Sequence, residues 1–281
     1  GIMCSTDFKE VIEGADFILH VTPSKFTRDT FKQYKQYVGK TPIIICSKGF
    51  EKETMKTLDE VILDELPEAR VGALSGPSHA EEVSIAIPTV LVMASKDKEV
   101  RELVQDAFMC SHMRVYTSED IKGVELGGAL KNIIALATGI SRGLGYGDNA
   151  TAALVTRGLA ELSRLGTAIG CSPYTFSGLT GMGDLIVTCT SIHSRNNNAG
   201  FLIGQGMSPD EAVKKVGMVV EGINAIPAAL KLADKYNVDL PIIFAVNDII
   251  NGDVSPQYAV NSLFNRELKA EVELNFPKEN Y

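Results

Sequence analysis

The sequence of 281 residues contains no tryptophan, and aromatic residues make up only 7% of it. Its five cysteines are odd in number, widely spaced and never arranged as C-x-x-C, so neither a disulfide framework nor a zinc ribbon is indicated. No apolar run approaches the ~18 residues that a membrane span needs, and the charged first twenty residues do not resemble a signal peptide. We therefore expect a protein of a reducing, cytoplasmic compartment without membrane insertion.

Positive charge is also scarce. There are 27 Lys and Arg residues against 35 Asp and Glu, a formal net charge of -8, which is the wrong sign for general affinity to nucleic acid or anionic lipid. The four histidines do not group in the sequence, so no metal site is predicted. With 45% hydrophobic and 22% charged residues, the composition is that of a globular protein, and the length suits roughly two domains.

The first part of the chain alternates short apolar runs with charged stretches, the pattern of parallel strands joined by crossover helices. The expected strands cover residues 16–21, 42–46, 70–74, 88–93 and 112–116, and the expected helices cover 27–38, 52–66 and 98–109. From about Ile121 onward, amphipathic helices replace the strands. We predict an α/β fold, with a partial Rossmann-type doubly wound parallel sheet in residues 1–122 and an all-α domain in residues 123–281.

Lys131 stands in an otherwise apolar helical stretch beside the small residues Gly127, Gly128 and Ala129. A buried lysine has a pKa below its usual ~10.4 and can act as a general base near neutrality. The alternative is a lysine whose side chain reaches solvent from a surface helix, and this segment alone favours that alternative.

Two motifs follow expected strands. Lys48 would lie at the carboxyl edge of the sheet, where α/β proteins place ligands, unless it is simply a solvated loop charge. The turn at residues 75–78, Ser-Gly-Pro-Ser, could present backbone N–H groups to an anion, although such turns use glycine and proline in any case.

Polar residues also mark three helix starts in the second part. Asp184 follows the glycines of GLTGMGD, so it could hold a ligand hydroxyl, orient Lys131, or cap a helix. The S-R-N triplet at 194–196 suits either a phosphate site or a plain capping box. Glu221 precedes the expected helix 223–236 and by itself is an ordinary cap.

Taken in order, the segments SKGFEKET, SGPSHAEE, GVELGGALKNIIALATGI, GYGDNA, FSGLTGMGDLIVTCTS, SRNN and VVEG resemble the bacterial NAD(P)-dependent glycerol-3-phosphate dehydrogenases. The resemblance runs over essentially the whole chain in the family's order and approximate spacing. It implies that sn-glycerol 3-phosphate and dihydroxyacetone phosphate are interconverted with NAD or NADP, in glycerophospholipid synthesis, by a homodimer.

The resemblance also implies roles for individual residues. Lys131 is similar to the family's catalytic lysine, which takes the proton of the C2 hydroxyl as hydride leaves for the nicotinamide, and Lys48 and Asp184 complete the catalytic set. The implied substrate-binding residues are Lys48, Gly76, Ser78, Lys131, Asn132, Asp184, Thr188, Ser194, Arg195 and Asn196. The implied cofactor-binding residues are Lys48, Ala80, Arg195, Val219 and Glu221, and no metal is implied.

The sequence departs from the family's pattern in three places. The family opens with a strand-G-x-G-x-x-G-helix unit that seats the cofactor pyrophosphate, and this sequence contains none. Because the chain opens on Gly1 and the resemblance begins near Ile2, we expect a segment on the order of 30 to 60 residues to be missing and NAD(P) binding to be weak. His79 stands where the family usually has phenylalanine, and Asn197 where arginine commonly follows the triplet.

Two other functions stay open. A chain without its nucleotide half would be a non-catalytic, phosphate-binding or dimerising domain. A related hydroxy-acid dehydrogenase would also pair a dinucleotide fold with a helical domain and a catalytic lysine. The choice between NAD and NADP would be read by residues of the expected missing segment.

Overall fold

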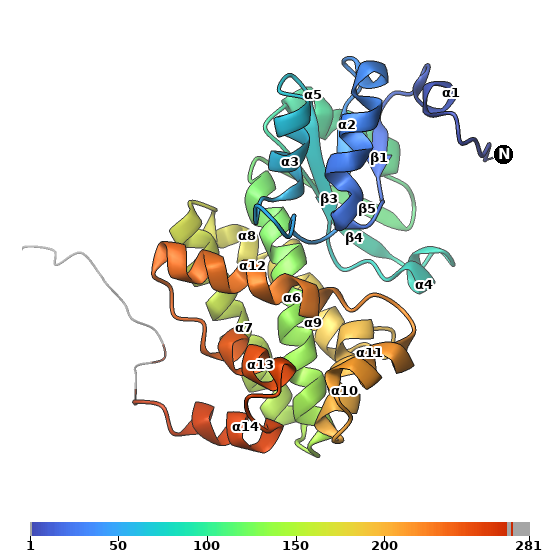
Figure 1. Cartoon of the computed structure of the whole chain (residues 1–281). Helices are drawn as coiled ribbons and strands as arrows, with labels where there is room; N and C mark the ends of the chain where they lie inside the picture. Colours follow the sequence, from blue (N-terminus) through green and yellow to red (C-terminus); the bar gives the residue numbers. More distant parts are fainter. Residues whose placement is uncertain (1, 269–270, 272–281) are drawn as a thin grey trace, which may run out of the picture.

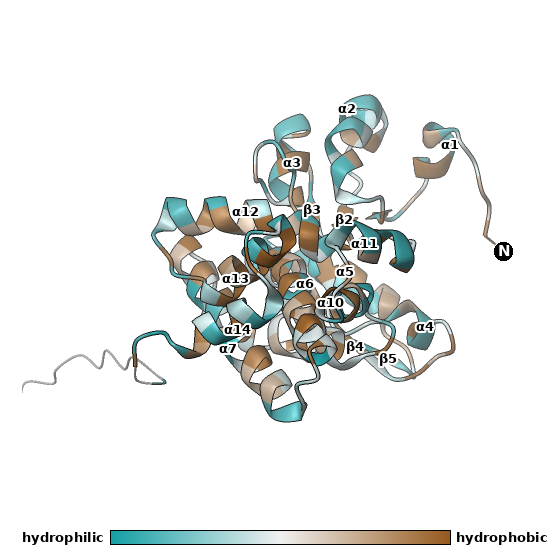
Figure 2. Cartoon of the chain, turned by 60° about the horizontal axis from the view of Figure 1, so that its bottom comes forward, coloured by the Kyte–Doolittle hydropathy of each residue, from teal (hydrophilic) through white to brown (hydrophobic). Residues whose placement is uncertain are grey.

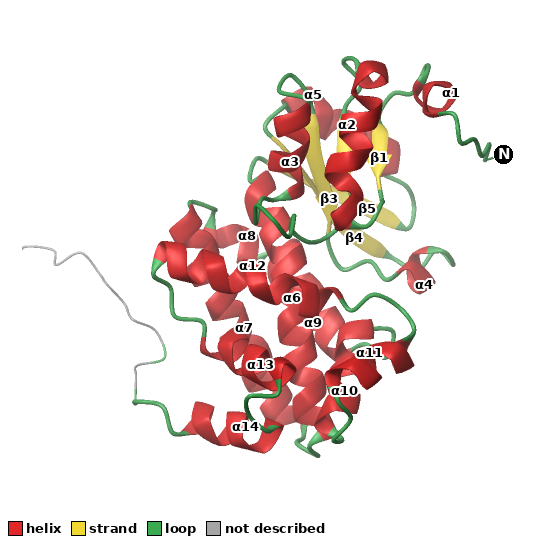
Figure 3. Cartoon of the chain, viewed as in Figure 1, coloured by secondary structure: helices red, strands yellow, loops and turns green. Residues whose placement is uncertain are grey.

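The computed structural model describes residues 2–268 and 271. A five-stranded sheet flanked by helices lies on one side of the molecule and a helical domain on the other (Figure 1). Figure 3 shows that the strands are confined to the first part of the chain and that the second part is helical. The expected α/β fold with an all-α C-terminal domain is confirmed. No helix in the described ranges is long and apolar enough to cross a membrane.

Every strand begins and ends within two residues of its expected position. The strands are β1 (Ile18–His20), β2 (Ile43–Ile45), β3 (Val71–Ser75), β4 (Thr89–Ser95) and β5 (Met113–Ser118), paired in that order.

The expectation of an entirely parallel sheet is wrong at one pairing, that of β3 with β4. β1, β2 and β3 are parallel, but β4 runs antiparallel to β3, and β5 is parallel to β4. A parallel connection needs a full helix that packs across the sheet. Residues 76–88 contain only the four-residue helix α4 (Ala80–Val83), so the chain instead turns back beside β3.

Helices cover both faces of the sheet. They are α1 (Phe8–Ile12), the 3-10 turn η1 (Ser24–Phe26), α2 (Thr27–Val38), α3 (Leu58–Glu65) and α5 (Lys98–Phe108). On β2, Ile43 and Ile45 pack with α2 and α3, whereas Ile44 packs with α5 on the opposite face. The helix expected from residue 52 begins only at Leu58, because Thr57 and Glu60 form a capping box there.

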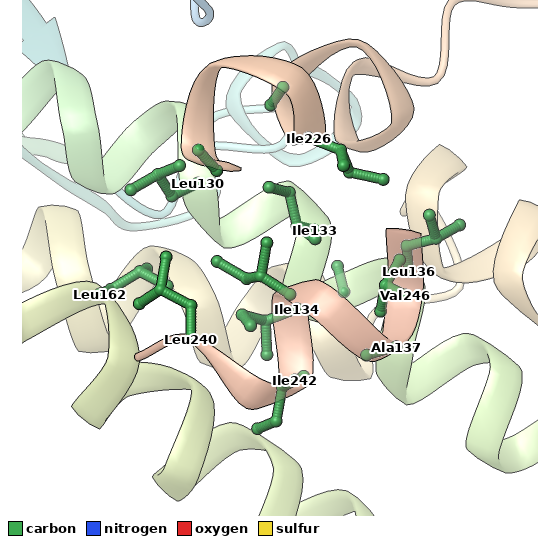
Figure 4. Packing of buried hydrophobic residues seen from close by; sticks show 14 of the residues in the cluster. Leu130, Ile133, Ile134, Leu136, Ala137, Leu162, Ile226, Leu240, Ile242 and Val246 are labelled. Carbon is green, nitrogen blue, oxygen red and sulfur yellow. The ribbon is translucent and has the colours of Figure 1, made fainter. Parts of the chain in front are cut away.

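The helical domain surrounds the 23-residue helix α6 (Ile121–Gly143). The other elements are α7 (Asp148–Ile169), α8 (Pro173–Ser177), η2 (Leu179–Gly183), α9 (Asp184–Thr190), α10 (Arg195–Gly204), α11 (Pro209–Val216), α12 (Glu221–Tyr236), α13 (Pro241–Asn251) and α14 (Pro256–Phe264). Figure 4 shows Leu130, Ile133 and Ile134 of α6 among apolar side chains that include Leu162 of α7 and Ile226 of α12. Hydrophobic residues concentrate on α6 and α13, whereas α11 is largely hydrophilic (Figure 2).

Helix α6 also fixes the helical domain to the sheet. Ile121 and Val124 belong to the apolar cluster beneath the sheet. The buried Glu125 carboxyl group accepts a hydrogen bond from the backbone N–H of Leu58 at the start of α3 (3.1 Å). The next turns of α6 therefore carry Lys131 to the boundary between the two parts.

Glycines allow α6 and α10 to lie against each other backbone to backbone. A Cβ atom on Gly139 of α6 would stand 2.1 Å from the carbonyl oxygen of Asn197, and one on Gly200 of α10 would stand 2.2 Å from that of Leu136. Because α6 and α10 are packed in the core and cannot separate without opening it, a side chain at Gly139 or Gly200 would have no space.

We predict that Gly200→Ala lowers the free energy of unfolding by about 2 to 3 kcal/mol, because its methyl group must push the two helices apart. Urea unfolding followed by circular dichroism measures the loss. Gly147→Ala is the control, since a Cβ at Gly147 meets no atom within 4 Å. Its cost should be about 1 kcal/mol or less, the effect of alanine at a helix N-cap. Equal losses in the two variants would contradict the close packing of α6 and α10.

Candidate functional site

Two lysines converge on one buried carboxylate at the boundary between the sheet and the helical domain. The Lys48 Nζ atom donates to Asp184 Oδ2 at 2.7 Å, and Lys131 Nζ donates to Asp184 Oδ1. Lys131 also donates to the hydroxyl of Thr188, one helical turn beyond Asp184, at 2.6 Å. These four residues form what we call the lysine–aspartate cluster.

The cluster excludes two of the simpler interpretations of its residues. Lys131 is only 5% exposed, so its side chain does not reach solvent from a surface helix. Asp184 is the first residue of α9 and is 2% exposed, and its carboxylate faces the lysines rather than capping the helix.

Burial and charge set the protonation states of the cluster. Burial, the largest cause, and the positive charge of Lys48 together lower the pKa of Lys131 to about 7, against the opposing attraction of Asp184. Burial by itself would raise the pKa of Asp184, but the charges of Lys48 and Lys131 outweigh it and hold that pKa below its ordinary value. Near neutral pH the site therefore holds an ionised carboxylate beside an amine that can gain or lose a proton.

The loop after β2 holds Lys48 in position. The Ser47 hydroxyl donates to the carbonyl oxygen of Thr22 at 2.5 Å, which ties this loop to the one after β1. Gly49 has φ +135°, and a Cβ on it would stand 2.8 Å from the Ser24 hydroxyl oxygen. The neighbouring loops at the carboxyl ends of β1 and β2 therefore hold each other in place. In open α/β sheets, ligands bind at this edge.

The glycines before Asp184 are needed for packing. Residues Leu179–Gly183 form a single π-type turn, and a Cβ on Gly181 would stand 2.0 Å from the Phe176 carbonyl oxygen. Such turns recur at functional sites. Gly183 lies near Pro77 of the turn after β3, because a Cβ on Gly183 would stand 3.7 Å from the Pro77 side chain.

The turn after β3 borders the same boundary. Gly76 has φ +145°, and a Cβ on it would meet the Val90 carbonyl oxygen at 2.9 Å. Ser78 is exposed, and its hydroxyl donates to the Gly76 carbonyl at 3.1 Å. Ala80, the implied cofactor contact, is exposed at the start of α4, and no hydrogen bond among the described residues joins it to the lysine–aspartate cluster.

The side chains of the S-R-N triplet are mostly engaged within the protein. The Ser194 hydroxyl caps α10 by accepting from the backbone N–H of Asn197 at 3.2 Å, as the capping alternative expects. The buried Asn196 amide donates to Asn132 Oδ1 at 3.0 Å, and its oxygen accepts from the Gly222 N–H at 2.8 Å. Arg195 is exposed and is the member of the triplet whose side chain stays available to a ligand.

The contacts of Asn197 explain why an asparagine fits at this position, where the family commonly has arginine. Its side chain is fully buried, where it donates to the Cys189 carbonyl at 2.9 Å and the Thr138 hydroxyl at 3.0 Å and accepts from Arg142 at 2.7 Å. The departure from arginine at this position therefore changes the contacts between helices α6, α9 and α10.

Glu221 brings α12 to the loop that carries Lys48. Its Oε2 atom lies 3.9 Å from the Cβ position of Gly49. Burial raises the pKa of Glu221, while a hydrogen bond with Asn224 and the charges of Arg195 and Lys25 offset part of the increase. Val219, by contrast, is 47% exposed and makes no hydrogen bond to the cluster among the residues described.

Sequence reasoning missed Ser24 and Lys25, which the fold brings beside Gly49 and Glu221. Both follow β1. The strand-end argument that selected Lys48 after β2 would have found them, had it been applied to β1 as well.

Comparison with known proteins covers both parts of the chain. The family model described as the N-terminus of NAD-dependent glycerol-3-phosphate dehydrogenase matches residues 1–101, and the one for its C-terminus matches residues 120–261. The glycerol-3-phosphate dehydrogenase [NAD(P)+] 2 of Lactobacillus delbrueckii subsp. bulgaricus is 52% identical over 278 residues, which are 96% of this chain and 82% of that enzyme. The Bacillus velezensis glycerol-3-phosphate dehydrogenase [NAD(P)+] is 51% identical over 89% of this chain and 73% of its own length.

Solved structures point to the same family as the sequence comparisons. The crystal structure of glycerol-3-phosphate dehydrogenase from Coxiella burnetii matches 92% of this chain and 80% of its own, with a TM-score of 0.88 and 38% identity. Because the N-terminal family model matches from residue 1, the expectation of a missing segment is not supported. The chain belongs to the NAD-dependent glycerol-3-phosphate dehydrogenase family.

Proposed function

We propose that this protein interconverts sn-glycerol 3-phosphate and dihydroxyacetone phosphate by hydride transfer with NAD or NADP, which serves glycerophospholipid synthesis. The observation that carries the proposal is the buried amine of Lys131, whose pKa is about 7 and whose partner is the ionised Asp184. Oxidation of an alcohol needs a base for the hydroxyl proton, and reduction of a ketone needs an acid at the same place. Lys131 is suited to both tasks near neutral pH.

Each residue of the lysine–aspartate cluster has a separate part in this chemistry. The neutral amine of Lys131 takes the proton of the C2 hydroxyl, and the ammonium returns it to the ketone oxygen in reverse. Asp184 holds that amine in place, and Thr188 fixes its direction. Lys48 has 27% of its side chain exposed, so it can meet a substrate oxygen while its charge lowers the pKa of Lys131.

The remaining implied residues divide between substrate and cofactor. Arg195 would bind the phosphate, with Ser78 and the Gly76 backbone on the facing turn, and Ser194, Asn196 and Asn132 would hold this wall of the site in shape.

The carboxyl ends of β1 and β2 fit the nicotinamide end of the cofactor. Glu221 reaches this edge, since its Oε2 atom lies 3.9 Å from the Cβ position of Gly49, the residue that follows Lys48. When bound, the nicotinamide would supply the acceptor or donor of the hydride for C2 of the substrate. The sequence holds no G-x-G-x-x-G turn for the pyrophosphate, so we assign only the nicotinamide end to these residues, with Ala80 and Val219 at its margin.

We also propose a domain boundary between residues 122 and 123, a cytoplasmic location and a homodimer. The boundary lies just after the start of α6, beyond the last strand. The five cysteines are all free thiols, which suits a reducing compartment. A hydroxy-acid dehydrogenase remains the enzymatic alternative, and the basic Arg195 beside the site favours the phosphorylated substrate over it.

The function is tested by following oxidation of NADH and NADPH with dihydroxyacetone phosphate. We expect turnover that depends on the ketone, and we expect Lys131→Met to lower kcat by about 100-fold or more, the usual share of a general acid or base. Lys122→Met is the matched control on the same helix, because its partly exposed amine pairs with Glu60 rather than with the lysine–aspartate cluster. The control should keep kcat within about twofold, since exposed pairs contribute little.

Three outcomes would count against the proposal. Near-normal turnover of Lys131→Met would remove Lys131 from the reaction. No turnover in a folded wild-type chain that still binds the phosphorylated ketone would favour the non-catalytic domain. Faster turnover of an unphosphorylated keto acid would favour the hydroxy-acid dehydrogenase.

The pH dependence follows from the pKa of Lys131, about 7. Oxidation requires the neutral amine, so kcat/KM for sn-glycerol 3-phosphate should rise as pH increases through about 7. Reduction requires the ammonium, so its rate should fall over the same interval. In Lys48→Met the loss of the neighbouring charge raises the pKa of Lys131, and both transitions should move to higher pH. Profiles from pH 5.5 to 9.5 measure this, with Lys122→Met as the variant that should not move them.

A further inference from the structure

The last residue of β3 and the connection from β3 to α4 hold two buried polar atoms that have no hydrogen-bond partner among the described residues. They are the Ser75 hydroxyl oxygen and the His79 Nε2 atom. Buried polar atoms in folded proteins are nearly always paired, so an unpaired one calls for an explanation, and a ligand is one that the position of this connection suggests. Ser75 lies in a narrow space against Gly128 and Lys48. His79 lies four residues later in the chain, directly after Ser78.

His79 faces a second histidine from the helical domain. The ring centroids of His79 and His193 lie 6.1 Å apart. His193 is exposed and directly precedes Ser194 and Arg195, and His79 directly follows Ser78. The two imidazoles, which are far apart in the sequence, therefore join the two segments that border the candidate phosphate position.

This histidine pair is not a metal site of the usual kind. Groups of three or more His, Cys, Asp or Glu side chains that could hold a metal are absent from the described part of the chain. Arg195 lies two residues after His193, whereas the exposed Glu81 and Glu82 lie two and three residues after His79. The cation near His193 favours an anion as the ligand. Imidazole N–H groups are good donors to a phosphoryl oxygen.

The pair lies on the substrate side of the site. Pro77, two residues before His79, packs toward Gly183, which immediately precedes Asp184. The groups that suit the nicotinamide, Glu221 and Lys25, gather instead at the ends of β1 and β2.

We infer that His79 and His193 complete the phosphate subsite, with His79 Nε2 donating a hydrogen bond to a phosphoryl oxygen of the three-carbon substrate and His193 closing the outer side. The inference rests on the proposed function and adds two specificity-determining residues to it. A free phosphate group and the phosphate of the cofactor share this chemistry, so the test must separate the substrate from the dinucleotide.

Two substitutions at one position make the first test. His79→Phe keeps a planar ring and removes both nitrogens, and His79→Gln keeps an amide N–H close to the place of Nε2. In His79→Phe we expect KM for dihydroxyacetone phosphate to rise about tenfold, the effect of one lost hydrogen bond to a charged group, with kcat within twofold and KM for NAD(P)H unchanged. His79→Gln should recover most of that loss, which a purely structural role of the ring would not allow.

A binding measurement without turnover makes the second test. With only four histidines in the chain, the imidazole nitrogens can be followed by nitrogen-15 NMR while sn-glycerol 3-phosphate or inorganic phosphate is added. We expect the signals of His79 and His193 to move with either ligand. His20 is the internal control, because its ring is buried and Nε2 already contacts the Thr27 hydroxyl at 2.9 Å.

The outcomes distinguish this inference from the proposed function. An active wild type in which His79→Phe leaves KM for the ketone unchanged, or raises KM for NAD(P)H instead, overturns the histidine subsite alone. Absence of turnover in the wild type, with both histidine signals still moving on addition of phosphate, overturns the dehydrogenase and supports the subsite.

Discussion

The contact between the buried Lys131 amine and the Asp184 carboxylate is the constraint on which the rest of the structure depends. An amine that is 5% exposed is tolerated only with a charged partner, so α6 and α9 must approach each other closely at this point. The small residues beside Lys131 permit that approach. A Cβ on Gly127 would stand 3.1 Å from the Thr180 carbonyl oxygen of the turn that precedes Asp184.

The second lysine makes the contact chemically useful. The attraction of Asp184 by itself stabilises the Lys131 ammonium and acts to raise the pKa of Lys131. Burial, the largest cause, and repulsion from Lys48, which donates to the same carboxylate at 2.7 Å, together lower the pKa of Lys131. Gly128 leaves the space for this arrangement, because its Cβ position is 3.5 Å from the Lys48 side chain. The sheet thus adjusts the chemistry of a residue that belongs to the helical domain.

Periodicity in the sequence predicted the elements well, because strand and helix signals are local. It placed α2 at its observed bounds and each strand within two residues. The lysine–aspartate cluster could not be predicted from spacing, since Lys48 and Asp184 are 136 residues apart. Only the ordered series of family motifs indicated that Lys48 and Asp184 lie in one site. The sequence also could not decide that the side chains of Ser194 and Asn196 bind within the protein rather than to a ligand. A helix cap and a phosphate ligand use the same residue types.

The antiparallel strand β4 shows how a departure from the expected topology can serve the site. A parallel crossover after β3 would have carried the chain away across a face of the sheet. The chain instead turns back at the carboxyl edge, held by Gly76, which tolerates contact with the Val90 carbonyl. Residues 76–88 therefore stay at that edge, where Pro77 meets Gly183 and His79 meets His193. The reversal places a wall of the first domain against the helical domain at the point where Asp184 and Arg195 begin their helices.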